Sequence, residues 1–351
     1  MYDYEYTGCV RMNRFILRQS LLLFLTAVIW GVAFVAQSAG MDYVGPFTYN
    51  GVRCILGGLV LLPCIALLDR LQGGRSAQGD AAAQAAESMK TEEALQPTEC
   101  TVPPMPEETR KRNGRQLAAG GICCGIILFV ASSLQQLGIQ YTSVGKAGFL
   151  TAMYILLVPV MGLFVHKKVG MKVWIGVVFA VCGLYLLCMT NGFKLERGDA
   201  LVLACAVVFS LHILVIDYFS PKVDGVRMSC IQFWVCGIVA LLCSFVFEQP
   251  DLNSILAAWQ PVCYGGIMSC GIAYTLQIVG QKGMNPTVAS LILSLESVVS
   301  VVAGFLILEQ TMSRRELLGC SLMIVAIVLA QLPNRRNRCM IEEEVVETKQ
   351  G

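Results

Sequence analysis

Charged residues are scarce in this sequence. Asp, Glu, Lys and Arg make up only 14% of the 351 residues, whereas soluble domains carry roughly 25%. The deficit runs along most of the chain and 56% of the residues are hydrophobic, so the composition excludes a soluble globular fold. The net charge of +2 is too small to indicate nucleic acid as a partner. The composition is typical of an integral membrane protein.

The sequence also lacks the patterns of common catalytic and metal sites. It has only two histidines, His166 and His212, too isolated from each other to form a zinc pair. It contains no Walker A, HExxH or GxSxG motif, which excludes an ATP pump in this chain alone. The sixteen cysteines lie mostly in apolar runs, and we expect free thiols that pack as small hydrophobes. We therefore expect no metal, no cofactor and no enzymatic activity.

Long apolar runs are what the sequence does contain. About twenty mostly apolar residues span a bilayer as a helix. The first run is longer than the apolar region of a signal peptide, and more runs follow, so we expect it to remain as a helix. The sequence predicts an all-α integral membrane protein of about ten transmembrane helices, at residues 18–38, 46–68, 117–138, 144–165, 172–190, 200–219, 228–247, 260–280, 286–307 and 315–332.

The basic residues indicate how these helices are oriented. If the N-terminus, residues 1–17, is cytoplasmic, most of the 26 Lys and Arg residues lie on the cytoplasmic side, as the positive-inside rule requires. An even number of spans then leaves the tail, residues 333–351, in the cytoplasm as well. Residues 69–115 combine prolines with many charges, and we expect a flexible cytoplasmic loop; the alternative is a regulatory segment. Without a transit peptide, the expected location is the plasma membrane.

Two parts of the chain repeat each other. A shift of 142 residues places Leu134–Gly162 over Leu276–Gly304 without a gap, with identical residues at six positions. The third, fourth and fifth spans then lie over the eighth, ninth and tenth. Because five is odd, the second copy enters the membrane from the opposite side, as in the inverted repeats of secondary transporters. We predict two inverted five-helix repeats, residues 18–190 and 199–332, with a substrate cavity near the bilayer midplane between them.

Several segments along the chain form a pattern that is found in a known family. They are Ala27-Val-Ile-Trp30-Gly31, Arg53, Ala147-Gly-Phe-Leu-Thr-Ala-Met-Tyr-Ile-Leu-Leu-Val-Pro159, Trp174-Ile-Gly176, Gly183-Leu-Tyr-Leu-Leu187, Leu295-Glu296-Ser297 through Gly304, Glu309 and Gly319. With them the chain resembles the EamA-type members of the drug/metabolite transporter superfamily, over about residues 20–332. Ser297 stands where the family usually has proline. The resemblance implies a ten-helix carrier that is not powered by ATP and that usually exports amino acids, metabolites or toxic compounds.

One carboxyl group lies at the centre of a predicted span. Glu296 is in the middle of 286–307, where an ionisable group costs on the order of 2.5–3.5 kcal/mol on insertion scales and faces the protein interior or a wet cavity. Ser300 lies one turn further on the same side. We predict that Glu296 contacts substrate or carries a coupling proton; the alternative is a structural carboxyl group. Tyr154, its counterpart under the shift, is predicted to stack on or hydrogen-bond the substrate, or to pack in the core.

Other polar and aromatic residues within spans are further candidates. Gln135 and Gln277 are repeat mates, predicted at opposite mouths of the cavity, and Tyr274 shares a helix face with Gln277. Trp30 lies at mid-membrane rather than at the interface where tryptophan is enriched, which favours a cavity position. The alternative for each is packing or hydrogen bonding between helices.

Three residues have more specific expectations. His212 is a candidate proton relay, or a satisfied interior histidine. Pro159 removes a backbone donor and is predicted to kink the fourth span, which frees a carbonyl toward the cavity; the alternative is that it only shapes the packing. Arg53 lies inside the second span, and we expect it to snorkel or to pair with a carboxylate such as Asp42.

The sequence therefore predicts a secondary active transporter of a small metabolite that is amino-acid-like, nucleobase-like or drug-like, and that is exported by alternating access. Its partners are the small-molecule substrate, the lipid bilayer and a coupling proton. A homodimer is compatible with the sequence but is not predicted by it. The alternatives are an integral membrane enzyme acting on lipid and a non-transporting membrane scaffold.

Overall fold

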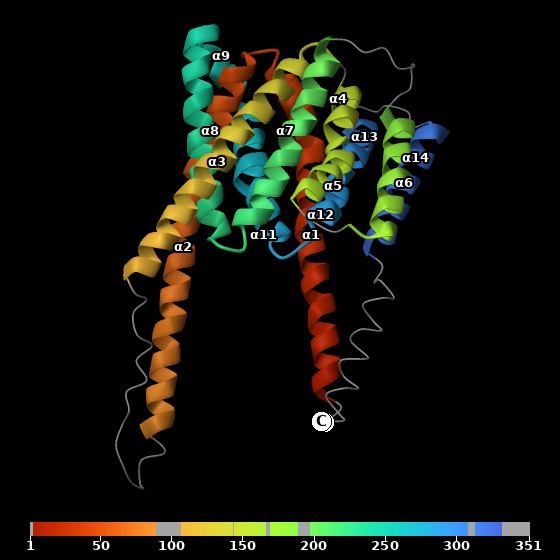
Figure 1. The fold of residues 1–351 in the computed structure, drawn as a ribbon. Helices are drawn as coiled ribbons and strands as arrows, with labels where there is room; N and C mark the ends of the chain where they lie inside the picture. Colours follow the sequence, from red (N-terminus) through yellow and green to blue (C-terminus); the bar gives the residue numbers. More distant parts are fainter. Residues whose placement is uncertain are drawn as a thin grey trace.

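The fold is a bundle of helices, shown by a computed structural model in Figure 1. The structure describes residues 3–88, 107–142, 144–165, 169–188, 197–307 and 313–331. No strand occurs in these ranges. The helices are α1 (Asp3–Gly40), α2 (Pro46–Ser88), α3 (Glu107–Ile139), α4 (Val144–Ala152), α5 (Tyr154–Phe164), α6 (Met171–Cys188), α7 (Arg197–Phe219), α8 (Gly225–Phe247), α9 (Leu252–Ala257), α10 (Trp259–Cys263), the π-helical segment η1 (Tyr264–Tyr274), α11 (Thr275–Gln281), α12 (Pro286–Leu293), α13 (Leu295–Ile307) and α14 (Arg314–Gln331).

Each predicted span coincides with an apolar helical stretch. Seven stretches in the described residues are long and apolar enough to cross a membrane, and three shorter apolar stretches coincide with the fifth, ninth and tenth predicted spans. Large apolar side chains remain exposed on the outside of the bundle, including Leu62, Ile126, Val178, Leu242 and Val328. An apolar surface of this extent needs lipid around it. The chain is an all-α, multi-pass membrane protein, as predicted.

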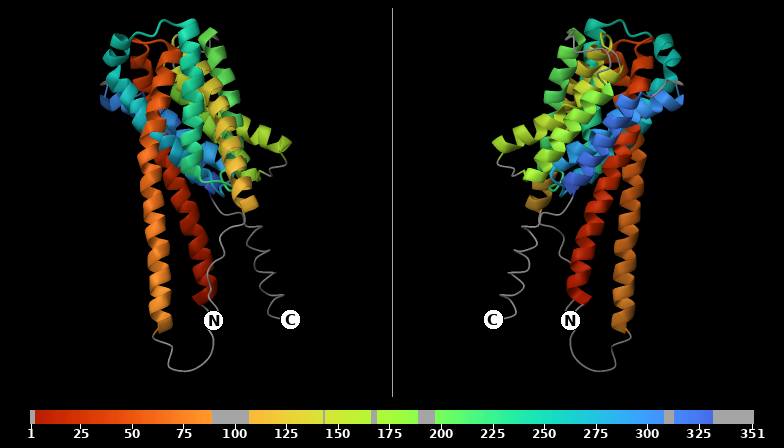
Figure 2. Two further views of the ribbon diagram at one scale, coloured as in Figure 1. Left: turned by 90° about the vertical axis from the view of Figure 1, so that its left-hand side faces the viewer. Right: turned by 90° about the vertical axis from the view of Figure 1, so that its right-hand side faces the viewer.

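The structure differs from the expected loop at residues 69–115. Helix α2 continues to Ser88 and α3 begins at Glu107, so helix replaces loop at both ends of this interval. Figures 1 and 2 show α1 and α2 extending past the rest of the bundle at the same end. The alanine-rich run Ala81–Ala86 accounts for part of the difference, because alanine has the highest helix propensity. Residues 89–106 and the tail at 333–351 lie outside the described residues.

The start of α2 is stabilised by a residue from another helix end. Glu248, which follows α8, accepts hydrogen bonds from the backbone N–H groups of Phe47 and Thr48 at 2.8 Å each. The Thr48 hydroxyl also donates to it at 2.6 Å. A carboxylate is favourable at the positive end of a helix dipole, and Pro46 at the first position needs no hydrogen-bond acceptor. This contact links the α1–α2 turn, residues 41–45, to the end of α8.

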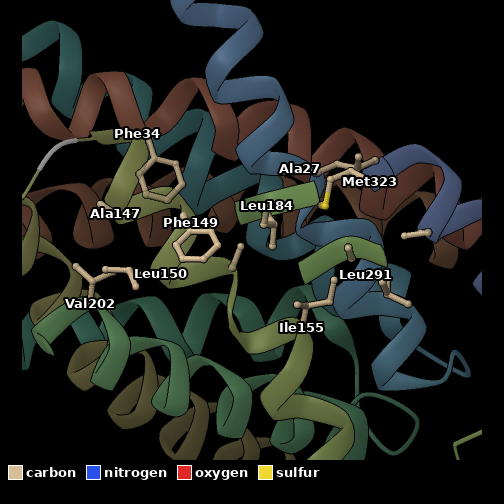
Figure 3. Packing of buried hydrophobic residues seen from close by; sticks show 14 of the residues in the cluster. Ala27, Phe34, Ala147, Phe149, Leu150, Ile155, Leu184, Val202, Leu291 and Met323 are labelled. Carbon is tan, nitrogen blue, oxygen red and sulfur yellow. The ribbon is translucent and has the colours of Figure 1, made fainter. Parts of the chain in front are cut away.

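The helices pack in pairs around an apolar interior. Helix α6 packs on α14 at one edge of the bundle, α2 packs on α8, and α3 packs on both α7 and α8. Helix α1 packs on α13, η1 and α11. Figure 3 shows one buried apolar cluster, in which Phe34, Phe149, Leu184, Leu291 and Met323 come together from five helices. Lipid chains are as apolar as these residues, so close packing rather than transfer from water holds such helices together.

Glycines allow the closest approaches between helices. A Cβ atom on Gly125 of α3 would lie 2.8 Å from the Gln232 carbonyl oxygen of α8, and one on Gly183 of α6 would lie 2.8 Å from the Gly319 carbonyl oxygen of α14. The pair Gly121 and Gly125 thus packs within the chain, as small residues at i and i+4 do in membrane helices.

Three of the spans are not continuous α-helices. The fourth is interrupted at Met153, between α4 and α5, and the ninth at Ser294, between α12 and α13. The eighth contains the 11-residue π-helical segment η1. Interruptions of this kind free backbone groups and often mark functional sites. All three lie beside the cavity described next.

Candidate functional site

A cavity lies inside the bundle where the interrupted helices meet. The cavity volume is about 40 Å³, which is room for a few water molecules, so a bound substrate requires a more open state of the bundle. Two charged residues, Arg53 and Glu296, contribute to its wall. The lining residues are Trp30, Phe34, Gln37, Arg53, Gln135, Thr151, Tyr154, Phe209, Ile213, Ser269, Tyr274, Gln277, Leu293 and Glu296. Six of the seven predicted cavity residues are in this set.

The centre of the site is a contact between the fourth and ninth spans. The phenol of Tyr154, the first residue of α5, donates a hydrogen bond to Glu296 Oε1 at 3.1 Å. Both side chains are almost fully buried, at 3% and 4% exposed. These are the residues that the 142-residue shift superposes, so under the predicted repeats each is the counterpart of the other. A carboxyl group in such apolar surroundings must be hydrogen-bonded or must bind a proton.

The local sequence explains why α12 and α13 separate beside Glu296. The hydroxyls of Ser290 and Ser294 donate to the backbone carbonyls of Thr287 and Leu291, at 2.9 and 2.7 Å. Such bonds compete with the helical hydrogen-bond ladder and bend helices. The Ser297 hydroxyl donates to the Gly148 carbonyl of α4 at 3.2 Å, which joins the two interrupted spans.

Ser300 is the predicted cavity residue that lies elsewhere. Its hydroxyl donates to the Ser297 carbonyl at 2.9 Å, and it lies 3.9 Å from where a Cβ on Gly148 would be. It therefore faces α4 and is not part of the cavity wall. The prediction used helix periodicity, which specifies a face but not which neighbour covers it.

Aromatic residues form one wall of the cavity. The rings of Trp30 and Tyr274 have centroids 4.6 Å apart, and the Trp30 Nε1 donor has no hydrogen-bond partner in the described part of the chain. Gln277, one turn after Tyr274, likewise has an Oε1 acceptor without a partner there. Water molecules in the cavity are able to satisfy such atoms.

A polar group lines the cavity toward the α1–α2 turn. Gln135 of α3 donates to the Thr151 hydroxyl of α4 at 3.3 Å, so this predicted mouth residue joins two helices as well as lining the cavity. Gln37 of α1 is buried, and its Oε1 has no partner among the described residues. Arg53 of α2 is only 3% exposed.

His212 lies behind the cavity wall. It is 1% exposed, its Nε2 is 3.2 Å from Gln232 Oε1, and its ring meets the edge of Tyr274 with centroids 6.2 Å apart. It is not a lining residue, and it lies one side chain away from the cavity. The proton-relay role of His212 stays a prediction. A relay from His212 to the cavity would pass through its neighbour Tyr274, which lines the cavity.

Pro159 is buried inside α5, which continues through it. The interruption of this span is at Met153, before the proline. Proline withholds one backbone hydrogen bond, here the bond to the Ile155 carbonyl, which lies after Met153, so Pro159 does not account for the interruption. The kink at Pro159 stays a prediction.

The sequence prediction missed part of the cavity. Arg53 was expected to snorkel or to pair with a carboxylate such as Asp42, but it is buried, and Asp42 is exposed and forms no ion pair with it. Its position within a span was the signal that could have found it. Gln37 and Thr151 were not predicted, and no periodicity indicates the π-helical segment that positions Ser269 and Tyr274. Among the described residues, no group of three or more His, Cys, Asp or Glu side chains could hold a metal ion; His166 and Glu309 lie outside them.

Comparison with known proteins identifies the family. The chain matches the EamA-like transporter family over residues 17–79, 103–189 and 196–332. It belongs to this family. The match extends over both predicted repeats and agrees with the resemblance seen in the sequence.

Relatives of this EamA-like chain are named as transporters. An uncharacterized transporter of Archaeoglobus fulgidus is 24% identical over 88% of this chain and 84% of its own length. The uncharacterized transporter YvbV of Bacillus subtilis is 22% identical, over 92% and 94%. The uncharacterized inner membrane transporter YedA of Escherichia coli is 20% identical, over 88% and 89%. The family and these names point to a membrane transporter rather than an enzyme.

A solved structure has the same fold. A chain described only as the crystal structure of a protein superposes with a TM-score of 0.66 at 18% sequence identity, over 91% of this chain and 98% of that one. At this identity the similarity shows the fold alone.

Proposed function

We propose that this protein is a secondary active exporter of a small metabolite, working by alternating access around the cavity at Tyr154 and Glu296. The observation that carries the proposal is the 3.1 Å hydrogen bond between these two residues. A residue that touches its own repeat counterpart lies beside the axis relating the repeats. Inverted-repeat transporters bind substrate at this place.

The packing of the helices supports two inverted repeats, residues 18–190 and 199–332. Under the proposed symmetry, α1 corresponds to α7, α3 to η1 and α11, and the pair α4–α5 to α12–α13. The contact of α3 with α7 then has its counterpart in the contact of α1 with η1 and α11. Likewise, the packing of α1 on α13 corresponds to that of α7 on α4 and α5. Two such halves can exchange conformations, opening the cavity first to one side and then to the other.

Glu296 is the proposed site of the coupling proton. It accepts from Tyr154 and forms no ion pair with a described residue, so a proton or a bound substrate is the available way to neutralise its charge. Binding of one would then displace the other. That exchange ties substrate movement to proton movement without ATP.

The cavity supports a small, partly aromatic substrate. Trp30, Phe34, Phe209 and Tyr274 offer apolar surface, while the unpaired polar atoms of Trp30, Gln37 and Gln277 favour a molecule with both hydrogen-bond donors and acceptors. Amino-acid-like, nucleobase-like and drug-like molecules meet this description. The distribution of basic residues supports cytoplasmic termini, and we propose the plasma membrane as the location. We propose export because the resemblance to the family implies it.

The test measures which compounds leave proteoliposomes that contain the protein, without choosing one substrate in advance. Vesicles loaded with a mixture of metabolites would be followed by mass spectrometry, with wild-type protein, Glu296→Gln and no protein. The proposal expects one chemical class to leave faster with wild-type protein and to lose most of that acceleration with Glu296→Gln. Equal efflux by wild type and variant would remove Glu296 from the transport site. If no class moves faster than from protein-free vesicles, the transport proposal fails.

A further inference from the structure

Arg53 is a buried cation within a membrane-spanning helix. It lies seven residues after the start of α2 at Pro46, so about 10 Å along the helix at 1.5 Å per residue. Its side chain lines the cavity and is 3% exposed. A guanidinium group stays charged in proteins, so this position requires a partner that compensates its charge.

The described residues near Arg53 compensate its positive charge only weakly. The guanidinium carbon lies 5.3 Å from the centre of the Tyr49 ring, which is a cation–π contact. It forms no ion pair with a described carboxylate, and its Nε donor has no hydrogen-bond partner among the described residues. A buried arginine without a carboxylate beside it is unusual.

The carboxyl groups on nearby elements have other positions or partners. Asp42 is exposed on the α1–α2 turn. Glu248 accepts from the backbone at the start of α2, and Glu296 accepts from Tyr154. The charge of Arg53 therefore faces a cavity rather than a protein partner.

We propose that Arg53 binds a carboxylate group of the transported molecule. This rests on the proposed function and adds the chemical class of the substrate. The planar guanidinium group matches a carboxylate through two parallel hydrogen bonds. Phe34 and Tyr274 provide apolar surface in the same cavity, and the unpaired Gln37 Oε1 accepts from a donor on the ligand.

A carboxylate fits the cavity better than a phosphate does. The described lining residues include one cation, Arg53, and one carboxyl group, Glu296. One guanidinium group balances a single negative charge, whereas a dianionic phosphate keeps a second charge that Glu296 repels. The substrate is thus a small zwitterion such as an amino acid, with one carboxylate for Arg53 and a cationic group that replaces the proton on Glu296.

The first experiment measures binding to the full-length, detergent-purified protein by calorimetry. The probes are the proteinogenic amino acids, benzoate and 3-phenylpropionate, each compared with its methyl ester, and 2-phenylethylphosphonate as the phosphate-like arm. We expect at least one acid to bind while its ester binds about tenfold or more weakly, because the ester cannot accept a charge-assisted pair of hydrogen bonds. The proposal is overturned if no acid of the set binds, if acids and esters bind equally, or if only the phosphonate binds.

Variants then test Arg53 itself. Arg53→Gln should weaken binding of that acid about tenfold or more, and Arg53→Lys should weaken it less. Arg227→Gln is the matched control, because Arg227 is an exposed arginine of α8 paired with Asp69 at 2.8 Å, outside the cavity. Equal weakening by the Arg53 and Arg227 variants overturns the proposal.

A measurement on wild-type protein covers the case in which Arg53→Gln does not fold. Phenylglyoxal modifies arginine, and mass spectrometry reports the modified fraction of Arg53 with the bound acid, its ester or chloride present. Protection by the acid alone supports the proposal, and equal modification in all three contradicts it. Efflux separates the two proposals: if only amines or neutral compounds are exported, with dependence on Glu296, the transport site stands and the carboxylate assignment fails.

Discussion

The two interrupted spans, α4–α5 and α12–α13, reach one backbone shape through different residues. The 142-residue shift places Met153 on Leu295, the residue that follows the interruption at Ser294. In α5 the proline, Pro159, lies six residues after the interruption. In α12–α13 the hydroxyls of Ser290 and Ser294 donate hydrogen bonds to backbone carbonyls one turn earlier.

The chemistry at the two interruptions also differs. One span carries a phenol at Tyr154 and the other a carboxyl group at Glu296, and the phenol donates to the carboxyl group. A symmetric contact between two carboxyl groups would bring like charges together. Under the proposed repeats, the two halves share a scaffold while they divide the roles of donor and acceptor. The following predictions test that division.

The largest expected effect is on the coupling between substrate efflux and proton movement at Glu296. Glu296→Gln keeps a hydrogen-bonding group beside Tyr154 but cannot bind or release a proton. A coupling free energy of about 1–3 kcal/mol corresponds to roughly 5- to 150-fold, and we expect efflux to fall by this order and to lose its dependence on the pH gradient. Glu248→Gln is the control, because Glu248 caps α2 outside the cavity. The same loss in both variants would mean that Glu296 has no special role.

Packing against α13 should differ between its two glycine neighbours. A Cβ on Gly31 of α1 would lie 2.6 Å from Val299 Cβ and 2.7 Å from the Glu296 carbonyl oxygen, so Gly31→Ala should destabilise the protein by about 1–3 kcal/mol. A Cβ on Gly148 of α4 would have its nearest neighbours at 3.9 Å. Gly148→Ala should be neutral or stabilising. Thermal unfolding in detergent measures both, and equal destabilisation would contradict the geometry.

The Tyr154 hydroxyl should make a smaller contribution to stability. Tyr154→Phe removes one hydrogen bond to Glu296, which is worth about 1 kcal/mol net. The double variant with Glu296→Gln should be less destabilised than the sum of the single variants, because the two residues interact directly. Full additivity in the thermal unfolding of the three variants would show that the contact has no energetic weight.

The smallest effect is expected at the Ser294 interruption. Ser294→Ala removes the back-bond to Leu291 and raises helix propensity, so stability should change by less than about 0.5 kcal/mol. Hydrogen exchange of the amides following residue 294 should slow as α12 and α13 join. Unchanged or faster exchange would show that the serine hydroxyl is not what interrupts this span.

Much of the fold could be predicted because lipid imposes a simple rule. Each span must be apolar over about twenty residues, so apolar runs placed the helices, and Glu296 and Trp30 stood out as residues that do not belong in lipid. The 142-residue register also paired Tyr154 with Glu296 before their contact was seen. These signals are local or periodic, and a sequence contains them directly.

The rest depends on contacts between distant parts of the chain. An ion pair between Arg53 and Asp42 was one expectation from the sequence, because both residues lie near the same end of α2. The direction in which the buried Arg53 side chain points depends on how α2 packs on α8 and η1. Ser300 shares a helix face with Glu296, yet α4 covers it. The interruption at Met153, six residues before Pro159, is indicated neither by helix propensity nor by the proline.

The measurement that tests the central claim most directly is ligand-induced thermal stabilisation of the purified protein. Amino acids, purines, sugars and cationic drugs would each be added to wild type, Glu296→Gln and Tyr154→Phe. A ligand at a hundred times its dissociation constant adds roughly 2.7 kcal/mol of stability. The account predicts a class of ligand that stabilises wild type strongly, Tyr154→Phe less, and Glu296→Gln least. A ligand that stabilises all three proteins equally would show that substrate binds away from the contact between the two halves.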